Sequence, residues 1–266
     1  FQSSGKKKFM ENENDKRIAV LIDADNVSDK YISFIFDEIS NYGIPTYKRI
    51  YGDWTTPQNA AWKKVLLNYS IAPIQQYSYT KGKNATDSAL IIDAMDILYS
   101  GNVDGFCIVS SDSDFTRLAA RLREAGMFVV GMGEQKTPSP FIAACEKFKY
   151  LEVLASSTED AQKAPAERPA AEKTGQKSSM ASLLQVTRAM EAIVKDISDD
   201  DGWAFLGAVG NLLNKRYPDF DSRNYGYPKL SQLVESLKQF DIDRRPTSNP
   251  HIRHAFIRLK PKKGRK

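Results

Sequence analysis

Aspartates follow two apolar stretches of this sequence. Asp23 and Asp25 come directly after one of them, and Asp112 and Asp114 follow the other. If the two stretches are neighbouring parallel strands, their carboxyl ends meet at one edge of a sheet, where ligands bind in open α/β folds. Carboxylates gathered there repel each other unless a hard cation such as Mg²⁺ or Mn²⁺ lies between them. The spacing therefore predicts a divalent-metal site.

A fifth aspartate, Asp87, stands at the start of an amphipathic stretch, where Thr86 is placed to cap a helix. The loop Lys81-Gly82-Lys83-Asn84 precedes it, so the Asp87 carboxylate could point into the same crevice. An ion held there would lower the pKa of a bound water and stabilise the charge that develops on a phosphodiester. We therefore predict hydrolysis of a nucleic-acid backbone.

Each aspartate also has a structural interpretation. Aspartate after a strand is a common helix N-cap, and Asp25 or Asp114 taken alone would more often be a cap than a ligand. Several such residues at strand or helix ends are harder to explain as caps, so together they favour a site. Two further aspartates lie inside the predicted helix: Asp93 suits a supporting or ligand role and a solvated helix face equally well, whereas Asp96 is expected to be solvated.

The elements that would position these carboxylates alternate between residues 16 and 154. Short apolar runs predict buried parallel strands over 18–22, 46–51, 71–76, 106–110 and 128–132. Amphipathic stretches predict helices over 29–42, 58–69, 87–99, 115–125 and 140–145, and the short run 150–154 closes the unit. This alternation is typical of an α/β fold, a parallel sheet sandwiched by helices.

A second unit follows a stretch with almost no large apolar side chains. Residues 155–180 cannot bury enough surface to offset the entropy of ordering, so we predict a flexible linker. The second unit spans 181–260, with helices over 183–195, 205–216 and 230–240 and a strand over 254–259. Residues 1–15 are expected to be a tag remnant and a disordered start, and 261–266 a basic tail.

The composition adds few constraints. The formal net charge is +5, but much of the positive charge lies near the two ends, so it is weak evidence for nucleic-acid binding. The cysteines, Cys107 and Cys145, form neither a disulfide framework nor a zinc motif and are expected to be buried thiols. Since no apolar run approaches the roughly 18 residues of a membrane helix, we expect a soluble, cytoplasmic protein without a membrane partner.

Other catalytic chemistries have less support. His251 and His254 lie in the second unit, far from the aspartates in sequence, so a Ser-His-Asp triad is not predicted. Asp23-Ala24-Asp25 after a buried strand would also suit a haloacid-dehalogenase-type phosphatase, in which the first aspartate is the nucleophile. Val27 weakens this alternative, because that signature has threonine there.

The aspartates of the first unit lie in three motifs, namely Leu21-Ile-Asp-Ala-Asp-Asn-Val27, then Lys81-Gly82 leading to Thr86-Asp87 and Asp93, and finally Val109-Ser-Ser-Asp-Ser-Asp-Phe115. These motifs resemble those of the bacterial NYN domains, which are PIN-like nucleases. The resemblance implies a PIN-like sheet over residues 17–154. It also implies that the metal ligands, direct or through water, are Asp23, Asp87, Asp112 and Asp114, with Asn26 orienting a carboxylate or touching phosphate.

Three segments of the second unit carry a further resemblance, namely Gly202–Gly210, Pro218–Tyr227 and Lys229–Val234. They resemble the OST-HTH or LOTUS domain, a small winged-helix fold associated with RNA binding. Tyrosines and cations here could stack on bases and contact phosphate, although Tyr225 also suits core packing. The candidate nucleic-acid contacts in the two units are Lys81, Lys83, Arg223, Tyr225, Tyr227, Lys229, Arg244 and Arg245.

Together these features predict an Mg²⁺- or Mn²⁺-dependent endoribonuclease whose C-terminal domain binds RNA to recruit the substrate. The main alternative is a regulator that binds RNA or protein through a weak or inactive NYN site. A homo-oligomer or a protein partner held by the C-terminal domain is compatible with either function.

Overall fold

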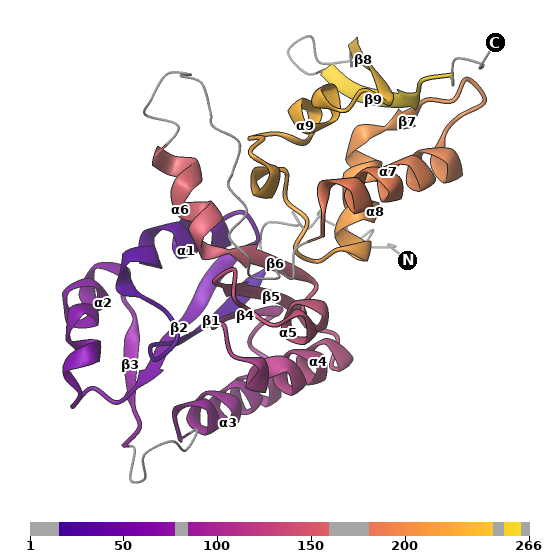
Figure 1. Cartoon of the computed structure of the whole chain (residues 1–266). Coiled ribbons are helices and arrows are strands. Elements are labelled where there is room, and N and C mark those ends of the chain that lie inside the picture. The colour runs from indigo at the N-terminus through magenta and orange to yellow at the C-terminus, as the bar shows by residue number, and fades with distance from the viewer. Residues whose placement is uncertain (1–15, 78–84, 160–180, 247–252, 262–266) are drawn as a thin grey trace, which may run out of the picture. The chain divides into compact units, whose positions relative to one another are not determined.

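A computed structural model describes residues 16–77, 85–159, 181–246 and 253–261 (Figure 1). A six-stranded sheet lies at the centre of the first part, in the order β3-β2-β1-β4-β5-β6. Its strands are β1 Arg17–Asp23, β2 Ile44–Gly52, β3 Ala72–Gln75, β4 Gly105–Val109, β5 Phe128–Gly133 and β6 Lys147–Tyr150. Neighbours from β3 to β5 pair in parallel, which confirms the predicted α/β sheet.

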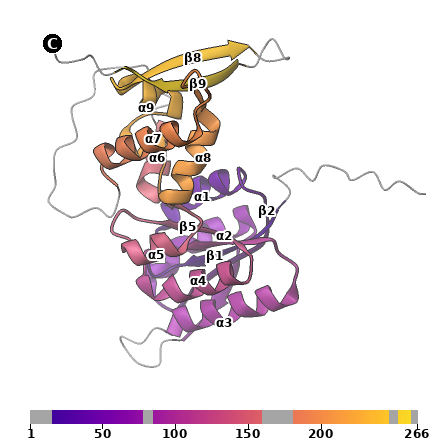
Figure 2. The ribbon, with the colours of Figure 1, turned by 90° about the vertical axis from the view of Figure 1, so that its right-hand side faces the viewer.

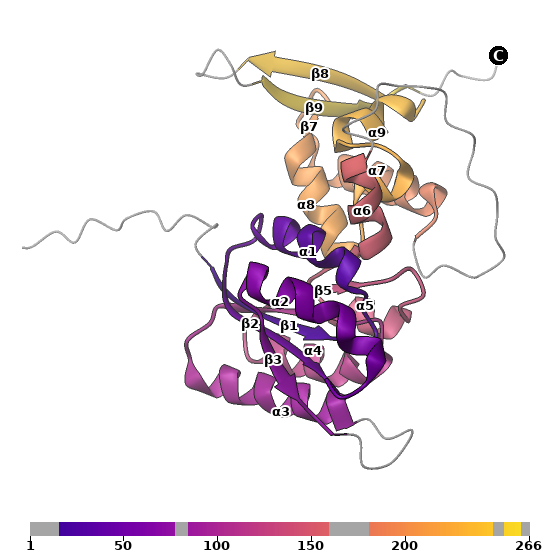
Figure 3. The same ribbon diagram turned by 90° about the vertical axis from the view of Figure 1, so that its left-hand side faces the viewer.

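Helices cover both faces of this sheet. Figures 2 and 3 show α1 and α2 on one face and α3 and α4 on the other. Strands with both faces covered read as nearly continuous apolar runs, and residues 18–22 and 105–109 are buried accordingly. The helices are α1 Ile32–Ile39, α2 Lys63–Tyr69, α3 Ala85–Ser100, α4 Thr116–Glu124 and α5 Ser139–Ala144.

Short 3-10 turns precede three of these helices and account for differences from the predicted boundaries. They are η2 Asp29–Tyr31, η3 Pro57–Trp62 and η4 Ser113–Phe115. The predicted helix over 29–42 is therefore a 3-10 turn followed by α1, which ends at Ile39. Similarly, the predicted helix over 58–69 begins as a 3-10 turn and becomes α-helical only at Lys63.

The end of the first part differs from the sequence prediction. Residues 147–150 form the edge strand β6, which was not predicted. The run 150–154, expected to close the unit, instead begins helix α6 Leu151–Glu159. This helix continues through residues 155–159, which had been assigned to the linker.

The C-terminal part, residues 181–261, combines helices α7 Leu183–Ile197, α8 Leu206–Arg216 and α9 Leu230–Ser236 with a small antiparallel sheet. A capping box between Ser182 and Gln185 begins α7. The sheet has the order β7-β9-β8, with β7 Ala204–Phe205, β8 Phe240–Pro246 and β9 Arg253–Leu259. Strands β7 and β8 were not predicted, and the helix predicted over 230–240 ends four residues early, at Ser236.

Contacts along the backbone divide the chain into two compact units. One contains residues 1–110 and 117–132, and the other contains 111–116 and 133–266. Cys107 and Cys145 are both buried free thiols, as expected. Among the described residues, no helix is long and apolar enough to cross a membrane.

Candidate metal centre

The acidic residues lie where the strand order of the large sheet reverses direction. Starting from β1, the chain adds β2 and β3 on one side and β4, β5 and β6 on the other. In open α/β sheets such a switch point opens a crevice at the carboxyl ends of the strands. Because Ile22 pairs with Val109 across β1 and β4, Asp23 and Ser110 follow at the same edge. The expectation that these two strands are neighbours is therefore confirmed.

Asp23 is fully buried at the end of β1. Its Oδ2 accepts hydrogen bonds from Ser110 Oγ at 2.7 Å and from Asn26 Nδ2 at 2.8 Å, and its Oδ1 accepts one from the Asp25 amide at 3.0 Å. Burial raises the pKa of Asp23, and these hydrogen bonds oppose the shift by stabilising the carboxylate. The protein thus holds a desolvated carboxylate in one orientation, and Asn26 helps to set that orientation.

Ser110 received no role from the sequence, although it is the first serine of the Ser-Ser-Asp-Ser-Asp motif. It is fully buried and links the end of β4 to the carboxylate at the end of β1. Its position could have indicated this role. A hydroxyl at the end of a buried apolar strand needs a hydrogen-bond partner.

Three other carboxylates form the candidate metal-binding group. One oxygen each from Asp87, Asp112 and Asp114 can be chosen so that all three lie within 4.8 Å of one another. Asp87 comes from the first turn of α3 and is 9% exposed. Asp112 is the N-cap of η4, and its Oδ1 accepts the Asp114 amide at 2.9 Å. The capping interpretation and the ligand interpretation of Asp112 are therefore both compatible with the structure.

The donor set suits a hard divalent cation. All three groups are carboxylates, and oxygen-only donor sets favour Mg²⁺, Mn²⁺ or Ca²⁺ over softer metals. Ligand oxygens on opposite sides of Mg²⁺ would lie about 4.2 Å apart, since each Mg–O distance is about 2.1 Å. The spacing of the three carboxylates is close to this range, so they fit such an ion.

The predicted four-aspartate set divides into two groups. Asp87, Asp112 and Asp114 form the three-carboxylate group, whereas Asp23 is held by Ser110 and Asn26 and is not a member of it. Lys81 and Lys83 lie outside the described residues.

The sequence alone allowed either a supporting role or a solvated position for Asp93. In the structure Asp93 is partly buried and hydrogen-bonded. Its carboxylate accepts hydrogen bonds from Arg49 and from the Tyr51 hydroxyl, both on β2. Burial and the adjacent carboxylate raise the pKa of Tyr51, so Tyr51 remains a proton donor. Asp93 therefore fastens α3, which carries Asp87, to the strand beside β1.

Replacing Asp93 with alanine is expected to destabilise the fold by about 2 kcal/mol, because Arg49 and Tyr51 lose their shared acceptor in a partly buried place. Urea denaturation of the wild type and the variant would measure the difference. The matched control is Asp96→Ala, because Asp96 is exposed on the same helix. Equal losses of unfolding free energy in the two variants would contradict the proposed fastening role of Asp93.

Comparison with known proteins supports this assignment of the fold. The model of the NYN domain family matches residues 17–152, which include all the aspartates described above. The chain belongs to the NYN family. The OST-HTH/LOTUS domain model matches residues 181–252, so the two domains follow one another in the predicted order. The fold class is likewise confirmed as a PIN-like α/β sheet with a small C-terminal domain.

Solved structures similar to this NYN protein come from three bacteria. A protein of unknown function from Vibrio parahaemolyticus is 19% identical to this chain, with a TM-score of 0.43. The match covers 52% of this chain and 94% of the Vibrio protein. An uncharacterised protein from Nitrosomonas europaea is 36% identical, with a TM-score of 0.29. That match covers 40% of this chain and 96% of the Nitrosomonas protein. Residues 175–257 of a Chromobacterium violaceum protein match at 38% identity, covering 30% of this chain and 78% of that one, with a TM-score of 0.22. None of the curated proteins compared with the chain matches it.

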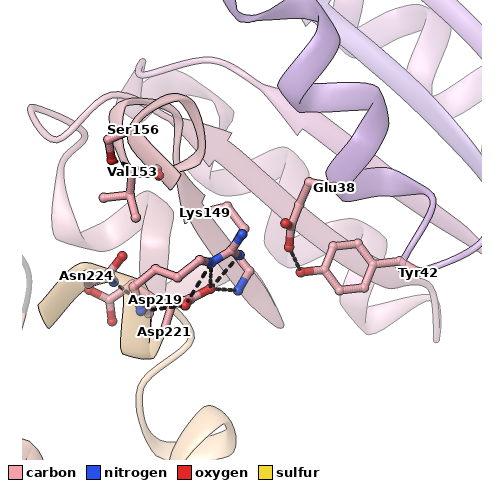
Figure 4. Close-up of polar contacts among 9 residues, drawn as sticks. Glu38, Tyr42, Lys149, Val153, Ser156, Asp219, Asp221 and Asn224 are labelled. Atoms are coloured by element: carbon pink, nitrogen blue, oxygen red, sulfur yellow. Dashed lines mark hydrogen bonds and ion pairs between the residues drawn. The ribbon is translucent and has the colours of Figure 1, made fainter. Parts of the chain in front are cut away.

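Among the candidate RNA contacts in the OST-HTH domain, Arg223 and Tyr225 make contacts that stabilise the fold. Asp221 accepts hydrogen bonds from Arg223 and also pairs with Lys149 of β6 (Figure 4). Tyr225 packs against the hydrophobic core, and its hydroxyl donates to the Ala181 carbonyl at 2.9 Å. These contacts give Arg223 and Tyr225 structural roles.

The remaining candidates differ in their surroundings. Tyr227 is partly buried against the same core, and Lys229 is exposed. Arg244 pairs with Glu235, and Arg245 pairs with Asp243 and lies over two aromatic rings. Arg245 is therefore the candidate whose environment includes aromatic groups.

The ion pairs of Asp221 predict a stability that depends on pH. Burial alone would raise the pKa of this carboxyl, but Arg223 and Lys149 outweigh that effect and hold the pKa well below its usual range. Because the unfolded pKa is about 3.9, the carboxylate stabilises the fold above that pH, and this contribution is lost as the pH falls through the folded pKa. The Lys149 and Asp221 side chains are only 13% and 12% exposed, so Asp221→Asn should cost about 3 kcal/mol at pH 7.

Urea denaturation at pH 7 and at about pH 2 would test this, because the contribution is lost mainly below the unfolded pKa. The wild type should lose more stability than Asp221→Asn between the two pH values. The exposed pair of Asp196 and Arg216 provides the control, since Asp196→Asn should change stability by less than about 1 kcal/mol. Parallel pH profiles for the wild type and Asp221→Asn would refute the role assigned to Asp221.

Proposed function

We propose that this protein is an endoribonuclease that requires Mg²⁺ or Mn²⁺, with its active site at the β1–β4 switch point. The observation that carries the proposal is the convergence of Asp87, Asp112 and Asp114 to within 4.8 Å at that edge of an NYN domain. The OST-HTH domain adds a module of a type associated with RNA binding, which makes RNA the substrate best supported. We propose that this domain binds RNA and recruits it to the site.

Each carboxylate has a proposed task. Asp87, Asp112 and Asp114 would hold the cation, and Asp23 would contribute directly or through water, kept in place by Ser110 and Asn26. A bound Mg²⁺ or Mn²⁺ would supply acidification of a water and neutralisation of charge on the scissile phosphate. The fixed carboxylates orient the site in advance, because hydrogen bonds already set Asp23 and the η4 turn already sets Asp112.

The phosphatase alternative is disfavoured by the environment of Asp23. A carboxylate nucleophile must present an oxygen to the phosphorus atom. Asp23 is fully buried, and both of its oxygens accept hydrogen bonds from the protein. Asp23 is therefore better suited to a fixed supporting role at this edge of the sheet than to covalent attack.

The test is cleavage of labelled RNA by the full chain, with single-stranded and structured substrates and a DNA of the same sequence. Incubation with EDTA should leave the RNA intact, and added Mg²⁺ or Mn²⁺ should produce internal cuts. Equal cutting in EDTA would exclude metal dependence. Absence of cutting with either metal would instead favour a regulator that binds RNA or protein without cleaving RNA.

A further inference from the structure

One face of the C-terminal sheet carries aromatic and arginine side chains together. We call it the aromatic–arginine face. Figures 2 and 3 show the helices of this part on one side of β8 and β9, and none of its described helices covers the other side. Ala204 of β7, Phe240 of β8 and Ile257 of β9 are buried in the core beneath the sheet. The side chains of the aromatic–arginine face are Trp203, Phe205, Arg245, His254, Phe256 and Arg258.

The strand register brings these side chains together. Phe205 pairs with Phe256 across β7 and β9, with ring centroids 5.7 Å apart, and its ring lies 5.1 Å from that of His254. Arg245 of β8 pairs with His254 of β9. Its guanidinium carbon lies 4.3 Å from the centre of the Phe256 ring. The result is a continuous group of rings and a guanidinium plane across three strands.

Trp203 extends the face beyond the end of β7. The guanidinium of Arg258 lies over its ring at 4.6 Å, and that of Arg245 lies at 5.4 Å. Gly202 has a φ of +78°, which other residues rarely adopt, and a Cβ there would lie 3.4 Å from the Arg258 side chain. At Gly207 a Cβ would approach the Phe205 ring to 2.7 Å. Gly207 thus leaves room for the Phe205 ring, whereas a Cβ at Gly202 would make only an ordinary contact with Arg258.

Two aspartates of β8 lie on the same side of the sheet as Arg245 and pair with the arginines of this face. Asp243 accepts Arg245 Nε at 2.9 Å, and Asp241 pairs with Arg258 at 3.5 Å. The Arg245 side chain is 39% exposed, whereas Arg258 Nε is buried and has no hydrogen-bond partner among the described residues. Phe205 is 42% exposed, and His254 is also exposed. The Phe205 ring and the Arg245 side chain are therefore both partly accessible to solvent.

We infer that the aromatic–arginine face binds single-stranded RNA, which deepens and rests on the RNA-recruiting role proposed for this domain. Unpaired bases stack on aromatic rings and on guanidinium planes, whereas bases in a duplex are already stacked on each other. The charge of the adjoining sequence suits a polyanion: β9 begins at the exposed Arg253 and leads into Lys260, after which the sequence continues with Lys262, Lys263, Arg265 and Lys266. Of the described residues, the exposed Arg253 and Lys260 would contact phosphates beside the stacked bases.

Neighbouring arginines on β8 allow a matched test. Arg245 belongs to the aromatic–arginine face. Arg244, the residue before it in the strand, pairs with Glu235 of α9 instead. Removing either one changes the net charge equally. A nonspecific electrostatic effect would weaken binding equally in the two variants, whereas a stacking site requires Arg245 alone.

The experiment is fluorescence anisotropy with a labelled single-stranded RNA, in EDTA, using the full chain with Asp112→Asn so that cleavage does not interfere. Phe205→Leu and Arg245→Ala should each weaken binding about tenfold, and Arg244→Ala less than about threefold. Equal losses for Arg244→Ala and Arg245→Ala, with no effect of Phe205→Leu, would overturn the inference. Failure of the parent chain to bind RNA would overturn it as well.

The readout separates this inference from the nuclease proposal. Binding in EDTA does not depend on the metal centre, so a chain that binds through the aromatic–arginine face but never cuts RNA would remove only the nuclease proposal. A chain that cuts RNA but binds it equally well with Phe205→Leu and Arg245→Ala would remove only this inference. Sedimentation of the same variants should show one unchanged oligomeric state; self-association lost in Phe205→Leu, without an effect on RNA, would instead identify a protein interface.

Discussion

Asp112→Asn is expected to lower the rate of RNA cleavage by about a thousandfold. The substitution removes one charged ligand from the three-carboxylate group while keeping the size of the side chain. Asparagine is also among the best N-cap residues, so the oxygen that accepts the Asp114 amide in η4 can be retained. The loss should therefore arise from the metal centre and not from the turn that carries it.

The control for this prediction is Asp96→Asn, which removes the same charge from the exposed side of α3. It should cleave at the wild-type rate. The activity of both variants should be compared at saturating Mg²⁺, alongside circular dichroism to verify folding. Wild-type cleavage by a folded Asp112→Asn variant would remove Asp112 from the site.

Asp87→Asn is expected to be about as stable as the wild type without metal and less stable than the wild type when metal is added. Without metal, the variant loses favourable attraction between Asp87 and the amino end of α3, worth about 0.3–1 kcal/mol. It also loses repulsion from Asp112 and Asp114, which offsets that cost. In EDTA the two proteins should therefore be about equally stable.

With metal at a hundred times its dissociation constant, the wild type should gain about 2.7 kcal/mol, because the ion binds the folded state. The variant should gain much less, since it lacks the least exposed of the three ligands. Thermal unfolding in EDTA and in Mn²⁺ measures both differences. Equal stabilisation of the two proteins by Mn²⁺ would show that the ion binds elsewhere.

The sheet was predictable where its strands are buried on both faces. Strands such as β1 and β4 appear as continuous apolar runs between helical stretches, and neither needs knowledge of distant partners to be recognised. β8 was missed because Asp241 and Asp243 alternate with its apolar residues and resemble polar coil, although this alternation is itself a strand signal.

The end of α9 shows a second limit of sequence patterns. Leu230, Leu233, Val234, Leu237 and Phe240 keep helical spacing, so the pattern predicts a helix to residue 240. The chain nevertheless leaves the helix at Leu237, where the backbone becomes extended and no glycine or proline marks the change. Phe240 instead begins strand β8 by pairing with Leu259 of β9. A local sequence pattern does not reveal this pairing, because the two residues are far apart in sequence.

The candidate site was predictable to the extent that it depends on strand ends. Parallel neighbours bring the ends of β1 and β4 together, so Asp23 and Asp112 could be placed at one edge of the sheet from their spacing. The partners of Asp93 could not, because Arg49 is 44 residues away and joins it only through packing of α3 against β2. Nor could spacing distinguish the grouping of Asp87 with Asp112 and Asp114 from the separate hydrogen-bonded setting of Asp23.

The measurement that tests the metal centre most directly is a titration of the full chain with Mn²⁺. Electron paramagnetic resonance measures the concentration of free ion at each step. The wild type should show saturable binding, and Asp112→Asn should bind at least about tenfold more weakly. Asp96→Asn should bind as the wild type does. Equal Mn²⁺ affinity in the wild type and Asp112→Asn would contradict the assignment of a divalent cation to Asp87, Asp112 and Asp114.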